Sequence, residues 1–205
     1  KYIQMFKKAG MNLVSLETES SALARALAAK AKSTVAIVDI GSTDIDIIIV
    51  DNVIPYIDRS VNVGGYHMTG KLSETMGVTM EQAEQFKRDL ANYSADMDGK
   101  LIPPAIEKII TPVVNEVKYL FEFFGKQPGN ESKNIDRIIL SGGNAMLFNL
   151  PDYFTDRFNV RAFLGNPWAR IIYLYLQLLT HRNAKSFARR HERSRKTRQK
   201  RRCWF

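Results

Sequence analysis

Three apolar runs follow one another closely in the first third of the chain. They cover residues 35–40, 45–50 and 53–63, and their many β-branched side chains predict three strands. A Gly-Ser-Thr segment at 41–43 separates the first two runs, and Asp-Asn at 51–52 separates the next two. Connections this short are typical of hairpin turns, so the pattern predicts an antiparallel meander.

Apolar residues at helical spacing occur on both sides of this meander. Residues 18–29 are rich in Ala and Leu and predict a helix with Ser20 or Ser21 near its start. A second helix is expected after Thr79, a good N-cap that Glu and Gln follow. Its apolar face has the spacing i, i+3 and i+7 and consists of Ala83, Phe86 and Leu90.

The longest helical signal covers residues 103–124, where Pro112 either kinks the helix or begins a second one. After it, the pattern predicts a strand running into a double-glycine turn at 135–143, a short helix at 149–158 and a short strand at 160–164. Strands and helices in this order predict an α/β domain with a mixed sheet.

Composition narrows the class of protein. The chain has 205 residues, 45% of them hydrophobic, which suits a globular domain, and no apolar run is long enough for a membrane span. No secretory signal pattern opens the sequence, and the single cysteine excludes an intramolecular disulfide and fits a reducing compartment. The sequence contains no P-loop or G-x-G-x-x-G motif, and its three histidines lack metal-ligand spacing.

The net charge of +9 comes from the last 25 residues. Residues 181–205 hold eleven Lys or Arg and one Glu, whereas residues 1–180 hold 19 basic and 20 acidic side chains. The body is therefore nearly neutral and carries no signature of specific nucleic-acid binding. The basic end is expected to bind polyanions nonspecifically at low salt.

Two of the predicted strands end in small residues, at 41–43 and at 141–143. A glycine turn lets backbone N–H groups come close to an anion. Two such strand ends can converge on one ligand, the first on phosphates and the second on a nucleoside. The residues alone leave simpler interpretations open, namely a plain turn at 41–43 and close packing at 141–143.

Five segments occur in this order: LVSLETESSALARAL, VDIGST, NVGGYHMTGKLSETMGVTMEQAEQFK, LSGGNAMLFNLPDYFTDRFNV and GNPWARIIY. With them, residues 1–173 resemble the actin-like ATPase superfamily and, within it, the PilM family of type IV pilus assembly, a relative of FtsA. The resemblance implies an actin-like, ribonuclease-H-like α/β fold that is incomplete at both ends. Residues 1–30 would end a first domain and its connecting helix, 31–173 would form the second domain with a helical insertion at about 66–100, and 174–205 would be a basic tail.

The resemblance also implies a site for ATP and Mg2+. Asp39 would face the metal or the attacking water, residues 41–43 would hold phosphate, and residues 142–144 would hold the nucleoside. Glu84 and Lys87 would border the ribose and adenine, although a solvated helix pair explains their i, i+3 spacing equally well. The implied nucleotide-binding residues are Asp39, Gly41, Ser42, Thr43, Gly64, Gly65, Glu84, Lys87, Gly142, Gly143 and Asn144.

The chain departs from the family pattern in three ways. Ile45 stands where the family usually has Thr, and Asp44 and Asp46 have no role that the pattern explains. An earlier Asp-x-Gly phosphate motif, which the family carries in a first domain, is absent. The chain is therefore expected to be the C-terminal part of a larger protein and to bind nucleotide weakly.

By resemblance, the chain is expected to be an ATP-binding scaffold of type IV pilus assembly, cytoplasmic and held at the inner membrane through its partners. It would dock the N-terminal cytoplasmic segment of a PilN-like inner-membrane protein. It would not be a turnover enzyme, with at most weak ATPase activity in a full-length protein. Two alternatives remain, an actin-like ATPase with hydrolytic turnover and an FtsA-like membrane tether of cell division.

The family resemblance ends near Leu174. The sequence then becomes rich in Arg, Lys, Ser, Thr and Gln. Reading a gene in a shifted frame produces such an abrupt change, and a frame shift is the favoured interpretation. The alternative is a basic tail that binds nucleic acid or anionic lipid, since each Lys or Arg near such a lipid surface contributes about 1 kcal/mol.

Overall fold

The computed structural model describes residues 1–28, 33–92, 104–147 and 149–170. The chain divides into two units, Lys1–Asn166 and Pro167–Phe205. The described residues of the second unit form a 3-10 helix, η3 (Pro167–Arg170). The basic tail at 174–205 lies outside the described residues.

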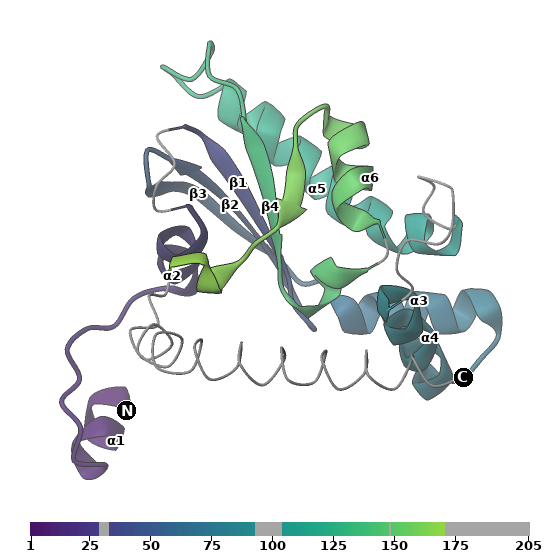
Figure 1. Ribbon diagram of the computed structural model, residues 1–205, viewed down its shortest axis with the longest axis horizontal. Coiled ribbons are helices and arrows are strands. Elements are labelled where there is room, and N and C mark those ends of the chain that lie inside the picture. Colours follow the sequence, from purple (N-terminus) through teal and green to yellow (C-terminus); the bar gives the residue numbers. More distant parts are fainter. Residues whose placement is uncertain (29–32, 93–103, 148, 171–205) are drawn as a thin grey trace, which may run out of the picture. The chain divides into compact units, whose positions relative to one another are not determined.

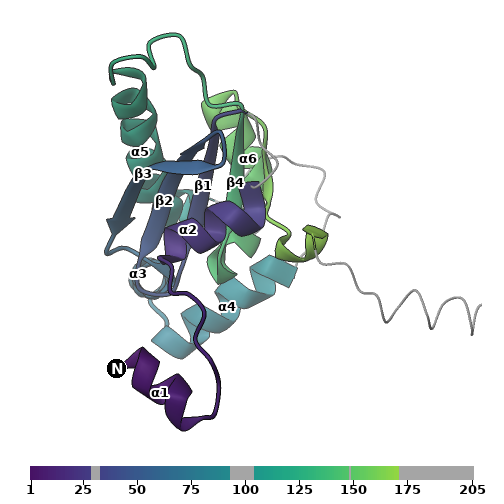
Figure 2. The same ribbon diagram turned by 90° about the vertical axis from the view of Figure 1, so that its left-hand side faces the viewer.

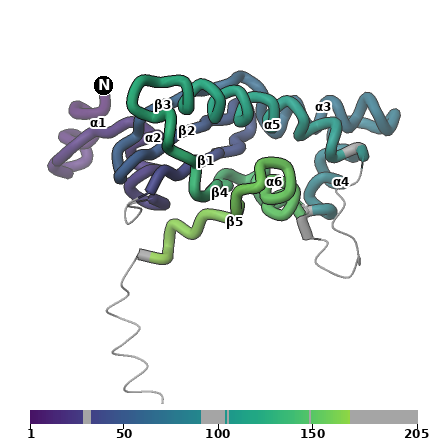
Figure 3. Tube along the Cα trace, turned by 90° about the horizontal axis from the view of Figure 1, so that it is seen from above, coloured from purple at the N-terminus to yellow at the C-terminus, as the bar shows by residue number. Residues whose placement is uncertain are grey.

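A five-stranded mixed sheet forms the centre of the first unit (Figure 1). Its strands are β1 (Val35–Ile40), β2 (Ile45–Asp51), β3 (Ile54–Val61), β4 (Arg137–Ser141) and β5 (Ala162–Leu164). The order across the sheet is β3-β2-β1-β4-β5 (Figure 3). The first three strands are antiparallel, which confirms the meander, while β4 pairs with β1 in parallel and β5 pairs with β4 in parallel.

Helices cover both faces of this sheet (Figure 2). The helices of the first unit are α1 (Tyr2–Lys8), α2 (Glu19–Leu23), the π-helical η1 (Ala24–Ala28), α3 (Gly65–Met76), α4 (Met80–Asn92), α5 (Pro104–Gly125), the 3-10 helix η2 (Gly143–Met146) and α6 (Leu150–Phe158). On one face, α5 and α6 pack against the strands around Ile110 and Phe154. On the other, α2 and η1 cover Ile37. Burial on both faces explains why β1 and β2 are almost continuously apolar.

The helices expected at 18–29, after Thr79 and at 103–124 are confirmed as α2 with η1, α4 and α5. Thr79 caps α4 reciprocally with Gln82: the Gln82 amide donates to the Thr79 hydroxyl at 3.3 Å, and the Thr79 amide donates to Gln82 Oε1 at 3.0 Å. The helix α5 runs through Pro112 without ending. No helix in the described ranges combines the length and apolar composition that crossing a membrane requires.

Two expectations for single residues are wrong. The pattern predicts Val53 in a strand, but Val53 and Asn52 form the two-residue turn between β2 and β3, with φ of +74° and +47°. Phe86 is expected on the buried face of α4, but it is 37% exposed. The buried positions of that helix include Ala83 and Lys87, which are four residues apart.

Candidate functional site

The two turns that contain the predicted site glycines lie at one edge of the sheet. β1 and β4 are parallel neighbours, and Asp39 is level with Ser141 near their carboxyl ends. The first turn (residues 41–44) and the second turn (residues 142–144) therefore emerge side by side, as expected, although about a hundred residues separate them. In open α/β sheets, ligands bind outside the carboxyl ends of the strands.

The start of α3 joins the two turns. The Gly65 amide donates to the carbonyl oxygen of Gly41 at 2.9 Å, and the Tyr66 amide donates to that of Ser42 at 2.7 Å. From the second turn, the side-chain amide of Asn144 donates to the same Gly41 oxygen at 2.8 Å. Gly65 and Asn144, which are far apart in the sequence, thus donate to the same backbone carbonyl oxygen.

Close packing explains most of the predicted site glycines. Gly142 has φ of +84°, and a Cβ there would lie 2.7 Å from the carbonyl carbon of Ile40. A Cβ on Gly64 would lie 2.6 Å from the amide nitrogen of Asp44, and one on Gly41 would lie 2.9 Å from the Asp44 carbonyl oxygen. These glycines are therefore required by the fold, whether or not a ligand binds.

Gly143 is different from these glycines. A Cβ built on it would meet no atom within 4 Å, its φ lies outside the left-handed region, and the residue is exposed. Internal packing therefore gives no reason for a glycine at this position. The tip of the first turn is open as well, since Ser42 and Thr43 are exposed and their hydroxyls make no hydrogen bond within the described part of the chain.

A cavity of about 260 Å3 opens beside Gly143. Its lining residues come from α4 and from the second turn with the residues after it: Glu84, Lys87, Arg88, Gly143, Asn144 and Leu147. The structure thus brings the predicted pair on α4 together with two residues of the second turn. The volume is just below the roughly 300–1,000 Å3 of small-molecule sites, so the cavity can hold one portion of a nucleotide-sized ligand.

The pair on α4 is not a solvated surface pair. Lys87 is only 6% exposed, and its ammonium group donates to the Gly65 carbonyl at 3.0 Å, to the Thr69 hydroxyl at 2.8 Å and to the Glu84 carboxylate at 2.8 Å. Burial disfavours the charged form of Glu84, but the hydrogen bonds from Lys87 and Thr69 outweigh it and lower the pKa of Glu84 to about 2. Arg88 adds a second cation at 3.2 Å. The cavity therefore presents an ionised carboxylate in a fixed position.

Three carboxylates lie close together on the side of the sheet that α2 covers. Asp39 and Asp46 pair directly across β1 and β2, and Glu19 comes from the start of α2. Oxygen atoms of the three lie within 4.8 Å of one another. Because Mg2+ prefers oxygen ligands, these residues fit a divalent cation. Glu19 has no signal in the sequence, whereas the hairpin register around residues 41–44 places Asp46 opposite Asp39.

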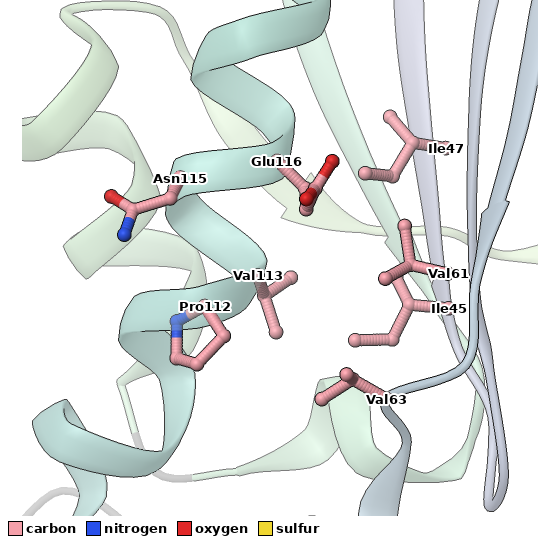
Figure 4. A pocket seen from close by; sticks show the side chains of 8 residues that line it. All are labelled: Ile45, Ile47, Val61, Val63, Pro112, Val113, Asn115 and Glu116. Carbon is pink, nitrogen blue, oxygen red and sulfur yellow. The ribbon is translucent and has the colours of Figure 1, made fainter.

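A second cavity, of about 270 Å3, lies between α5 and the strands β2 and β3 (Figure 4). Ile45, Val61 and Val113 are among the side chains that point into it. Ile45 therefore serves the core beside α5, on the face opposite the three carboxylates. None of the residues predicted to bind nucleotide lines this cavity.

Comparison with known proteins identifies the family. The model of a family described as type IV pilus assembly protein PilM matches residues 3–184. The chain belongs to the PilM family. The match covers most of the chain and extends about ten residues beyond the last of the PilM-like segments in the sequence.

Solved structures show that this PilM-family chain has the actin-like ATPase fold. A chain in a PilM-PilN type IV pilus biogenesis complex superposes with a TM-score of 0.62 at 21% identity, covering 87% of this chain and 52% of that one. MreB5 of Spiroplasma citri bound to ADP gives a TM-score of 0.59 at 18% identity, covering 91% and 66%. The ethanolamine utilization protein EutJ from Carboxydothermus hydrogenoformans gives 0.55 at 20% identity, covering 80% and 55%. The chain spans about half the length of the matched chain in the PilM-PilN complex.

Proposed function

We propose that this chain is a nucleotide-binding part of a PilM-type scaffold for type IV pilus assembly. The observation that carries the proposal is Gly143: an open glycine, not required by the fold, beside a cavity that also presents Glu84 and Lys87. The nucleoside part of a nucleotide in the cavity would approach the Gly143 backbone, and the phosphates of that nucleotide would reach the exposed Ser42 and Thr43. The solved MreB5 with the same fold holds ADP, which supports nucleotide as the ligand class.

Divalent metal fits the proposed phosphate end. Asp39 and Asp46, with Glu19, offer carboxylate oxygens close to the first turn. When bound there, Mg2+ would offset the negative charge of the phosphates. The carboxylate oxygens of the chain would hold the cation. The hydroxyls of Ser42 and Thr43 would remain available to the phosphates.

Nucleotide titration with matched glycine variants tests the proposal. The 205-residue chain should bind Mg-ATP weakly, with Kd near or above ~1 mM, because a single domain encloses only part of the ligand. Gly143→Val should abolish binding, since the added side chain would occupy the path to the cavity. Gly125→Val is the matched control, because a Cβ on Gly125 also meets no atom within 4 Å but lies in α5.

Both variants are expected to fold. Thermal unfolding checks this first, and ligand-observed NMR then measures their nucleotide affinity. Equal nucleotide affinity in Gly143→Val and Gly125→Val would overturn the site. Micromolar affinity in the unmodified chain would show that this domain alone encloses the ligand.

We further propose that the scaffold is cytoplasmic and docks a PilN-like inner-membrane protein through that partner's N-terminal segment. The solved complex of PilM with PilN supports this class of partner. The resemblance to the PilM family implies a docking pocket in the family's first domain, of which residues 1–30 would be only the end, so we expect the 205-residue chain not to bind the PilN N-terminal peptide. A fluorescence titration at physiological salt tests this, because the basic tail would capture acidic probes at low salt. Saturable, salt-insensitive binding would place the pocket within residues 1–205.

A second candidate function is ATP hydrolysis with turnover, which the carboxylates of Glu19, Asp39 and Asp46 favour. Phosphate release from Mg-ATP distinguishes it from the scaffold. Asp39→Asn should abolish release if the group takes part in hydrolysis. If neither the unmodified chain nor any longer product of its gene releases phosphate, the hydrolytic function is excluded and the scaffold stands.

A further inference from the structure

Asn144 ties together two turns that the proposed function assigns to opposite ends of one nucleotide. Its side-chain nitrogen lies 2.8 Å from the carbonyl oxygen of Gly41 and 3.3 Å from that of Ile40. We propose that Asn144 is a positioning residue that fixes the spacing between the first turn and the second turn. The nucleotide part of this inference rests on the proposed function.

The chemistry of the tie requires an amide donor. The carbonyl oxygen of Gly41 has two lone pairs, and the Gly65 amide and the Asn144 side chain both donate to it. The Asn144 side-chain nitrogen donates to both the Ile40 and the Gly41 oxygens, so its donor groups are engaged within the chain. These hydrogen bonds hold the second turn in position beside the first turn.

Packing at Gly65 supports the same role. A Cβ on Gly65 would overlap the side-chain amide of Asn144. Gly65 is thus matched in shape to Asn144, and it also donates to the same Gly41 oxygen. Three segments of the chain, around residues 41, 65 and 144, meet at this point, and the side chain of Asn144 fills the space between them.

A double-mutant cycle tests the tie without nucleotide. Gly65→Ala should lower the Tm by about 4 °C in the unmodified chain, because the new methyl group overlaps Asn144. In an Asn144→Ala background, where the space is free, the same change should cost less than half as much. Equal costs in both backgrounds would overturn the steric match. Asn144→Asp keeps the shape but removes both donors, so it should lower the Tm more than Asn144→Ala, and an unchanged Tm would overturn the hydrogen-bonded tie.

A comparison of adenosine with ADP tests the positioning role. Asn144→Ala should weaken ADP, which spans both turns, about tenfold, as the loss of one or two hydrogen bonds predicts. Adenosine would contact α4 and the second turn but not the first turn, so Asn144→Ala should change its affinity less than about twofold. Equal losses for the two ligands would make Asn144 a nucleoside ligand and overturn the inference. If the unmodified chain binds neither ligand, the proposed function fails, and the Tm cycle still decides whether the tie exists.

Discussion

Val53 lies in the left-handed region of backbone conformation, with φ of +74°, in the turn between β2 and β3. Asn52 before it also has positive φ, as a two-residue type I′ hairpin turn requires. Left-handed backbone costs a residue with a Cβ about 1–2 kcal/mol, and Gly avoids this cost. Val53→Gly should therefore raise the free energy of unfolding by about 1 kcal/mol, after the larger entropy of Gly in the unfolded chain is subtracted. Chemical denaturation measures this change.

The control for this substitution is Val53→Ala, which removes the branched side chain but keeps the Cβ. It should recover only a small part of the gain. A Val53→Gly variant that is less stable than the original would mean that the exposed valine makes contacts that matter more than its backbone conformation. The sequence predicts a turn here but places it one residue early, because a valine that follows Asp-Asn and precedes Ile and Pro looks like the first residue of a strand.

Glu84 predicts a pH dependence of stability. Its pKa is lowered from 4.5 to about 2 in the folded chain, because hydrogen bonds from Lys87 and Thr69 outweigh burial. A lowered folded-state pKa stabilises the protein above the unfolded pKa, and this contribution is lost as the pH falls from about 4.5 towards 2. At pH 7, Glu84→Gln should cost about 1–3 kcal/mol, since it leaves a buried Lys87 without its carboxylate. The cost should shrink across that acid range.

Thermal unfolding of the unmodified chain and of Glu84→Gln from pH 7 down to pH 3 measures how the cost of the substitution decreases. Glu74→Gln is the matched control, because Glu74 also pairs with a lysine three residues away but both side chains are more than 60% exposed. The control should change stability little at any pH. A cost for Glu84→Gln that stays constant with pH would exclude an ionised Glu84 as its cause.

Among the helices, α4 and α6 each carry a phenylalanine, and the two differ in burial and therefore in the expected cost of substitution. Phe86 on α4 is 37% exposed, whereas Phe154 on α6 is fully buried against α5 and the sheet. Phe154→Ala should lower the free energy of unfolding by about 3–5 kcal/mol, because it leaves a cavity in the core. Phe86→Ala should cost less than about 1 kcal/mol. Urea denaturation of the two variants checks the contrast, and a large loss for Phe86→Ala would show that α4 buries a different face.

The elements themselves follow well from hydrophobic pattern. Continuous apolar runs locate β1 and β2, and the apolar spacing of α5 is regular enough to continue through Pro112. What pattern does not give is which strands are neighbours. The pairing of β1 with β4 joins segments a hundred residues apart, and no local feature specifies it.

The same limit applies to the candidate site. Residues at the ends of predicted strands, such as Gly41 and Gly143, could be found because turns interrupt the pattern there. Glu19 and Thr69 could not, because each reaches its partners only through packing of one element on another. Family motifs suggested Glu84 and Lys87, but burial of Lys87 is a property of the folded chain.

For the molecule as a whole, charge separates the body from the tail. Ending the chain at residue 174 removes all eleven basic residues of the last 25 and leaves a nearly neutral body. The shortened chain should lose retention on heparin at low salt, because nonspecific polyanion binding depends on clustered Lys and Arg. Chromatography of both chains over a salt gradient measures this effect. Unchanged retention would assign the binding to the body.

The same shortened chain tests whether the last 31 residues pack on the body. If they are an appended segment, its Tm should stay close to that of the whole chain. A loss of several degrees corresponds to about 1 kcal/mol or more for a domain of this size and would show native packing.

The parallel pair of β1 and β4 also determines when this sheet can be completed during synthesis. β1 ends at Ile40 and β4 starts at Arg137, so a ribosome adding about 5–20 residues per second needs about 5–20 s between them. Throughout this interval the hairpins of β1, β2 and β3 can form, but the inner edge of β1 has no neighbour and can pair with other chains. The second turn emerges after β4, so a ligand that needs both turns cannot protect this edge. A strand that is buried on both faces in the folded protein is thus left with an unpaired edge in the nascent chain.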